Sequence, residues 1–322
     1  MPELNGKARV GYRCVVAPRS PLPPIRGLDA ARLLTPTRVG DSVPQWETMG
    51  QWLRERLPVM VPVDQMIDGG EFVYEDGAPV RHADPFRHQT FIWFHRETLP
   101  EPVVPGDIHV VYQDQRILVV DKPPFLATTP RGRHVRQSVV VRLRDELGRP
   151  ELAPMHRLDR NTSGLLALTV EKHWRGVYQP LFDRGEVARK YWALAPLRAD
   201  LRFPRTVSNH LKKTTGVLQA AVVPGETPNA ETLVELEEER NGVGLYRLTP
   251  LTGRTHQLRA HLCGLGIPIL NDPLYPEVVD IAPDDFTKPM QLLAGEISFV
   301  DPVTSTHRFF RSERDLPLRP AR

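Results

Sequence analysis

The part of the chain from Asp107 onward carries many short strand-like segments and few helical ones. Apolar or β-branched runs bounded by turn residues indicate strands at 107–124 (two runs around a polar turn), 164–170, 191–197, 231–239, 243–251 and 290–300. Helical spacing of apolar residues occurs at 138–148, 173–185 and 256–266. Because strands and helices do not alternate as regular βαβ units, the pattern predicts an α+β domain over residues 107–322 with a large mixed, mostly antiparallel sheet.

Proline delimits a smaller unit ahead of this domain. The chain has 33 prolines in 322 residues, roughly twice the usual share of about 5%. Since proline interrupts helices and strands, its clusters predict a Pro-rich arm over 1–45 and a linker over 99–106. Residues 46–98 between them predict a small α+β module. Its expected elements are a helix at 46–58, a short helix ended by Gly69-Gly70, a strand at 71–74, a hairpin turn at Asp76-Gly77 into a second strand, and a strand at 91–94.

Composition bears on the compartment and partners of the chain more than on its activity. Arginine makes up 35 of the 42 cationic side chains, against 39 acids. Arginine binds phosphate bidentately and stacks on bases, which suits nucleic acid, although a GC-rich genome gives the same bias. Cys14 and Cys263 suit neither a disulfide framework nor a zinc ribbon. No stretch has the length of a signal-peptide core or a membrane span, so we expect a cytoplasmic protein outside the membrane.

The stretch MHRLDRNTSG (155–164) places a carboxylate, Asp159, between Arg157 and Arg160. A turn into the strand-like run GLLALTV follows, so Asp159 is expected at the mouth of a strand. Two flanking guanidinium groups favour the ionised carboxylate, which can act as a nucleophile, as a base or as an anchor for a cationic transition state. The alternative is a solvated ion pair on a loop, which contributes little to stability.

A second segment, TGRTHQLRAHL (252–262), combines arginine with histidine. His256 and His261 are five residues apart and have no accompanying glutamate, so they do not form the i, i+4 pair of a metal site. The segment can be an exposed basic helix face that contacts phosphate, as Arg259 would. Arg254, next to Gly253 at the turn, is expected to meet a carboxylate from another segment.

A third segment, VARKYWAL (187–194), interleaves cations with aromatic rings. Arg189, Lys190 and Tyr191 are the mixture that neutralises phosphates and stacks on unpaired bases. The alternative is a strand whose aromatic residues pack in the core. Neither the G-x-S-x-G elbow of serine hydrolases nor the phosphate-binding G-x-x-x-x-G-K-[ST] loop occurs in the chain.

These segments, in this order, resemble the RluA-type family of RNA pseudouridine synthases. The matching stretches are HRLDRNTSGLL (156–166), ARKYWAL (188–194), GRTHQLRAH (253–261) and GIPILNDPLY (266–275), and DIHVVYQDQRILVVDKPP (107–124) resembles the entry strands of that family. The resemblance spans roughly residues 107–310. Three long motifs in the right order are far more specific than any one of them.

The resemblance implies that the protein flips a uridine out of RNA and isomerises it to pseudouridine. It implies that Asp159 is the nucleophile, attacking either C1′ of the sugar or C6 of the base, and that Arg254 pairs with it. Tyr191 would stack on the flipped base and help to remove the C5 proton, and Arg157 would fill the gap that the base leaves. Further RNA contacts are expected from Arg160, Arg189, Lys190, His256 and Arg259.

The same resemblance bears on cofactors, partners and target. An isomerisation needs no metal and no cofactor, and RNA is the expected partner of a monomer. The expected target is structured RNA, 23S ribosomal RNA first and transfer RNA as the alternative. A catalytically idle RNA-binding protein of the same fold, and more distantly a metal-dependent nuclease, are the other readings. Residues 46–98 resemble a degenerate S4-type RNA-binding module, whose helices here carry acids such as Glu55 and Asp64.

Overall fold

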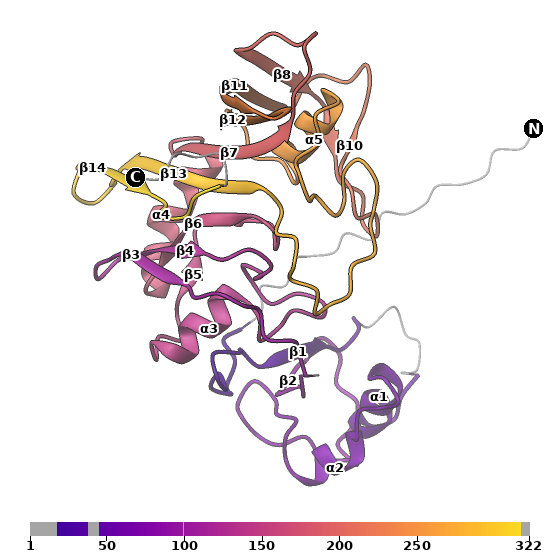
Figure 1. Cartoon of the computed structure of the whole chain (residues 1–322). Coiled ribbons are helices and arrows are strands. Elements are labelled where there is room, and N and C mark those ends of the chain that lie inside the picture. Colours follow the sequence, from indigo (N-terminus) through magenta and orange to yellow (C-terminus); the bar gives the residue numbers. More distant parts are fainter. Residues whose placement is uncertain (1–17, 38–44, 99, 317–322) are drawn as a thin grey trace, which may run out of the picture. The chain divides into compact units, whose positions relative to one another are not determined.

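The structure, a computed structural model, describes residues 18–37, 45–98 and 100–316 (Figure 1). Cys14 lies outside these residues. The chain divides into two units. Within the described residues, the first unit takes Asp29–Glu97 with the segment 18–25, and the second takes Arg26–Leu28 and everything from Thr98 onward. None of the described helices is long and apolar enough to cross a bilayer.

The first unit is a small α+β fold. Its helices are α1 (Met49–Arg56), which begins where the Thr48 side chain accepts a hydrogen bond from the Gln51 backbone N–H, and α2 (Val63–Asp68). Strand β1 (Ala31–Leu34) pairs antiparallel with β2 (Phe91–Phe94). The core consists of apolar side chains from both helices, from β2 and from the segment that follows α2, among them Met49, Trp52, Leu53, Met66, Ile67, Phe72, Ile92 and Phe94.

Two predictions for this unit need correction. Residues 31–34 were assigned to the arm, yet they form β1, because their pairing partner lies about sixty residues further along. The strand predicted at 71–74 and its hairpin partner form only isolated bridges from Val73 to Pro79 and Trp93 around the turn at Gly77. The likeness of this unit to an S4-type module stays a prediction.

The second unit is organised around one ten-stranded sheet, which confirms the predicted fold class. Eight strands follow the order β3-β4-β6-β13-β7-β12-β11-β8, while β14 pairs with β13 and β5 with β6. Among the strand pairs that the structure describes, only β6 and β13 are parallel. The strands are β3 (His109–Gln113), β4 (Ile117–Lys122), β5 (Ala153–Pro154), β6 (Ser163–Thr169), β7 (Ala188–Pro196), β8 (Arg205–Asn209), β11 (Ala230–Arg240), β12 (Val243–Pro250), β13 (Leu292–Val300) and β14 (His307–Arg311). A separate hairpin joins β9 (Leu211–Lys212) to β10 (Ala221–Val222).

Helices pack on both faces of this sheet. Side chains alternate along β4, so Leu118 and Val120 join α3 (Val139–Glu146) and α5 (Gln257–Gly264) in one core. Ile117 and Val119 join α4 (Arg175–Asp183), which follows a 3₁₀ turn at Lys172–Trp174, in a second core. The long apolar runs of β4 and β6 therefore reflect burial on both faces.

Strand β13 joins the two halves of the sheet and lies between β6 and β7 (Figure 1). Its contact with β6 depends on Gly164, which has φ +107° and pairs with Ala294. A Cβ atom at Gly164 would stand 2.3 Å from the Ala294 carbonyl oxygen. Glycine is required here both for the backbone angle and for the close approach of the two strands.

The predicted linker packs as part of the second unit where the structure describes it. The Glu101 carboxylate accepts hydrogen bonds from the backbone N–H groups of Val135, Arg136 and Gln137 at 2.7–3.0 Å. Val104 is buried. The carboxylate thereby fixes the loop ahead of α3, which carries cationic side chains to the cavity described below.

Candidate active site

The loop between β5 and β6 carries Asp159, and hydrogen bonds to its backbone hold it on both sides. The Thr128 hydroxyl donates to the Leu158 carbonyl at 2.8 Å and accepts from the Leu158 N–H at 3.1 Å. On the other side, the Lys122 ammonium donates to the Arg160 carbonyl at 3.0 Å. The Asp159 backbone is therefore fixed, while its side chain remains one third exposed.

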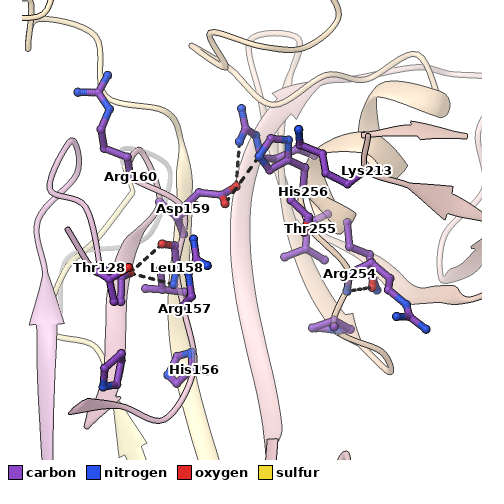
Figure 2. Close-up of a pocket in the computed structure, with 18 of the residues that line it drawn as sticks. Thr128, His156, Arg157, Leu158, Asp159, Arg160, Lys213, Arg254, Thr255 and His256 are labelled. Atoms are coloured by element: carbon purple, nitrogen blue, oxygen red, sulfur yellow. Dashed lines mark hydrogen bonds and ion pairs between the residues drawn. The ribbon is translucent and has the colours of Figure 1, made fainter. Parts of the chain in front are cut away.

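Asp159 opens into a cavity of about 840 Å³ in the second unit. The cavity is lined by the β5–β6 loop, β7, the segment from Pro250 to Arg259, and the β9–β10 hairpin. Figure 2 shows the Asp159 carboxylate pointing across the cavity toward His256 on the opposite wall. Of the predicted site residues, the cavity brings together Arg157, Asp159, Arg160, Arg189, Tyr191, Arg254, His256 and Arg259.

The partner of Asp159 is Arg259 and not Arg254. Arg259 Nη1 donates to Asp159 Oδ2 at 2.8 Å, whereas Arg254 is exposed and its Nε donates to the Asn229 carbonyl at 3.0 Å. In Figure 2 the Arg254 side chain points away from Asp159. The predicted Arg254–Asp159 pair is therefore wrong. Arg259 was predicted to contact RNA, but its side chain is only 3% exposed, so its guanidinium serves the carboxylates.

Arg259 is itself held by a second carboxylate, Asp272, which is fully buried. Asp272 binds the guanidinium bidentately, at 2.7 Å to Nε and 2.6 Å to Nη2. Burial opposes the charge of Arg259, but the hydrogen bonds and charges of Asp272 and Asp159 outweigh burial and raise its pKa above the usual range. A cation that is itself held by Asp272 thus donates a charge-assisted hydrogen bond to Asp159.

Tyr191 and Arg189 lie on the cavity side of β7, and Lys190 does not. Burial raises the pKa of the Tyr191 phenol, and Arg189 acts in the opposite direction through its charge and a hydrogen bond. Lys190 points to the other face of the sheet, where it pairs with Glu296 at 3.1 Å. The prediction that Lys190 contacts RNA beside the site is wrong, because successive residues of a strand face opposite sides.

Lys122 is a functional candidate that the motifs did not indicate. Its buried ammonium donates to the carbonyls of Pro123, Leu126 and Arg160, so each of its three N–H bonds has an acceptor. Burial lowers its pKa to about 7, against a smaller opposing effect of Asp159. The sequence signal that could have indicated Lys122 is its position at the end of the apolar run ILVVDK. A charged residue inside a buried strand needs hydrogen-bond partners.

Cations surround the mouth of the cavity. Arg157 is exposed and Arg160 is half-buried, as expected for residues that would meet RNA. Arg131, His134 and Lys213, which lie outside the three motifs, join them. Within the described part of the chain, no group of three or more His, Cys, Asp or Glu side chains is placed to hold a metal ion.

Comparison with known proteins identifies the family. A family model for RNA pseudouridylate synthases matches residues 116–263, which include Asp159, Tyr191 and Arg259. The dual-specificity RNA pseudouridine synthase RluA of Vibrio cholerae is 31% identical over 61% of this chain and 78% of that protein. The chain belongs to the RluA-type family of RNA pseudouridine synthases. This confirms the family resemblance of the three motifs.

Two further relatives of this RluA-type chain differ in length and in similarity. The human pseudouridylate synthase RPUSD2 is 34% identical over 55% of this chain, but the match covers 32% of that protein, so the chain spans about a third of its length. The solved structure of the human RNA pseudouridylate synthase domain containing 1 protein is 23% identical and superposes with a TM-score of 0.52 over 66% of this chain and 93% of that one. This second likeness shows a shared fold.

Proposed function

We propose that this chain isomerises specific uridines in structured RNA to pseudouridine, with Asp159 as the nucleophile. The observation that carries the proposal is the Asp159 carboxylate, which is paired with a buried arginine and projects into an open cavity rimmed by cations. Such a carboxylate is charge-paired, partly desolvated and accessible, which are properties that a carboxylate nucleophile needs.

The remaining cavity residues take roles that follow from their positions. Tyr191 forms an apolar wall on which a flipped base can stack. To accept the C5 proton, Tyr191 would have to be a phenolate. Burial disfavours the phenolate, whereas the charge and hydrogen bond of Arg189 favour it. Arg157, exposed beside the nucleophile, would enter the space that the base leaves in the RNA. Arg254, Arg160 and the other exposed cations would bind phosphates.

The reaction balances without an external reagent. The bond between N1 and C1′ of the uridine breaks, a bond between C5 and C1′ forms, C5 loses a proton and N1 gains one. Asp159 takes part as a transient covalent partner of C1′ or C6 and is released unchanged. The proposed target is 23S ribosomal RNA, with transfer RNA as the second candidate.

The test is tritium release from RNA labelled at uridine C5, with total RNA from a host that lacks this gene. Wild type and Asp159→Asn would be compared without added metal, with Asp183→Asn as control because Asp183 is an exposed carboxylate on the same cavity. We expect release by wild type and control only, and RNA binding by all three. Turnover by Asp159→Asn would refute the nucleophile. Binding without release by wild type would favour an idle RNA-binding protein.

Separate fractions of ribosomal and transfer RNA then test the target. Release from 23S ribosomal RNA is expected to exceed release from the other fractions under equal uridine concentration. Release confined to transfer RNA would overturn the ribosomal assignment and leave the reaction intact.

A further inference from the structure

The two oxygens of Asp159 have different surroundings. Oδ2 accepts a hydrogen bond from Arg259 Nη1 at 2.8 Å. For Oδ1, no hydrogen-bond donor is within reach among the described residues, and His256 Nε2 stands 3.9 Å from it. This separation is too long for a hydrogen bond, although the two groups face each other across the cavity (Figure 2).

The hydrogen bonds at Tyr275 bear on which nitrogen of His256 carries the proton. The Tyr275 hydroxyl accepts from the Ala220 N–H at 2.7 Å and uses its single proton to donate to the Ala220 carbonyl at 3.1 Å. His256 Nδ1 also lies 3.3 Å from that hydroxyl oxygen. With that proton directed to the Ala220 carbonyl, the phenol has none left for His256, and in this arrangement Nδ1 carries the hydrogen and donates it to Tyr275.

The other ring nitrogen of a neutral His256 is then unprotonated. Nε2 turns a lone pair toward Asp159 Oδ1 and has nothing to donate. The groups that face His256 are Asp159, Arg259, Asp272, Tyr275 and, from the β9–β10 hairpin, Lys213. Burial lowers the pKa of His256 despite the opposing charge of Asp159, so the neutral ring is favoured near neutral pH.

Asp272 fixes the Arg259 side of the same arrangement. It occupies Nε and Nη2 of the guanidinium, which leaves Nη1 for Asp159. Asp272 Oδ1 in turn accepts from the backbone N–H groups of Leu274 and Tyr275. The Tyr275 ring lies 5.3 Å from the guanidinium carbon and so covers it. One short segment, residues 272–275, therefore orients both groups that face the nucleophile.

We propose that Asp272 and Tyr275 are positioning residues that leave Oδ1 of Asp159 without a hydrogen-bond donor and thereby select Oδ1 as the attacking atom. This inference rests on the proposed function. In the attack, Oδ1 gives an electron pair to a uridine carbon. If the carbon is C1′, N1 leaves with the electrons of the broken bond; if it is C6, the π electrons of C5 and C6 move onto C5. An oxygen without a protein donor is the better nucleophile, since no fixed proton shares its lone pairs once the uridine displaces the solvent.

The first experiment reads the tautomer of His256 directly by long-range ¹H–¹⁵N NMR on the full chain, with His256→Gln to assign the signal. We expect the Nδ1–H tautomer in wild type and a shift to the Nε2–H tautomer in Tyr275→Phe, which lacks the accepting oxygen. An Nε2–H or doubly protonated ring in wild type at neutral pH would overturn the proposal. This measurement does not depend on activity.

The second experiment compares kcat and KM for Tyr275→Phe and Asp272→Asn on the RNA that wild type converts. Neither side chain lines the cavity, so we expect kcat to fall by about tenfold or more with KM within about twofold. A raised KM with unchanged kcat, or no change in either, would contradict the positioning role. Absence of release by wild type would refute the proposed function itself, whereas an active wild type with unaffected variants refutes only this inference.

A double-mutant cycle keeps the test decisive should Asp272→Asn fail to fold. If Tyr275 acts through His256, Tyr275→Phe should cost little further activity once His256 is replaced by leucine, which has no donor. If the fold-losses in kcat of the Tyr275 and His256 single variants multiply in the double variant, the two residues act independently, and Tyr275 acts through packing alone.

Discussion

Acidification from pH 8 to pH 5 is expected to destabilise the second unit through two histidines that the fold keeps neutral, one buried (His261) and one half-buried (His156). His261 is only 1% exposed, and its ring contacts Thr232 Oγ1 at 2.9 Å and Asn209 Oδ1 at 3.1 Å. Burial lowers its pKa to about 4. His156 stacks on Phe182 with ring centroids 4.4 Å apart, and burial lowers its pKa to about 3.

The sign and size follow from the protons bound in each state. Between the folded pKa of about 4 and the ordinary value of about 6.5, the unfolded chain binds more protons than the folded one, so stability falls as the pH falls. At pH 5 the unfolded histidine is about 1.5 pH units below its pKa, and each unit is worth about 1.4 kcal/mol. His261 should therefore cost about 2 kcal/mol, and His156 about the same.

Urea unfolding at the two pH values, followed by hydrogen exchange of a peptide from β12, measures this loss in the second unit. His261 and His156 together should account for about 4 kcal/mol of the wild-type loss, and His261→Gln should lose about 2 kcal/mol less than wild type. His173→Gln serves as control, because His173 is exposed and its replacement should leave the wild-type loss unchanged. An equal loss in wild type and His261→Gln would refute the reasoning, since the neutral buried ring would then contribute nothing to the pH dependence.

Three further variants test the packing and charge of the site. Arg259→Gln should lower the single-turnover rate of tritium release by about a hundredfold or more, which is roughly the effect of losing a buried charge pair. Arg254→Gln should weaken RNA binding and leave that rate within a few fold of wild type. The reverse pattern would restore Arg254 as the partner of Asp159. Lys122→Met leaves three carbonyls without their donor and should lower the free energy of unfolding in urea by about 3 kcal/mol or more. Lys190→Met, which breaks a surface ion pair, should lower it by under about 1 kcal/mol. Equal losses in the two variants would count against the role of Lys122. Gly164→Ala should be at least about 2 kcal/mol more destabilising than Gly185→Ala. Both glycines have positive φ, but only at Gly164 would the added Cβ atom clash with a backbone oxygen. Similar thermal midpoints for the two variants would contradict this clash.

The helices and long strands could be predicted because their signals are local. Apolar spacing located α3, α4 and α5, and the apolar runs located β4, β6 and β13, each within a few residues of the observed bounds. Strand β1 was missed because its identity depends on pairing with β2, about sixty residues away. Its four residues alternate only weakly and carry no signal that separates them from an extended arm.

The site illustrates the same limit for individual side chains. The motif containing Arg254 and Arg259 was found, but the sequence does not show which arginine reaches Asp159. That choice depends on the backbone just before α5, where His256 has φ 57° and so sets the direction of the following helix. The error at Lys190 was avoidable, since strand alternation places it opposite its neighbour Tyr191. Asp272 could not be assigned a role, because its partner comes from tertiary packing.

The place of β13 in the sheet has a consequence for how the protein is made. This strand is synthesised after both halves of the sheet that it joins, and its parallel contact with β6 passes over the glycine at 164. A nascent chain that ends before Leu292 already contains Asp159, Tyr191, Arg259 and Asp272, yet it lacks the strand that brings their two half-sheets together. Activity should therefore appear abruptly, late in translation, and the incomplete sheet before that point would be the stage most in need of chaperones.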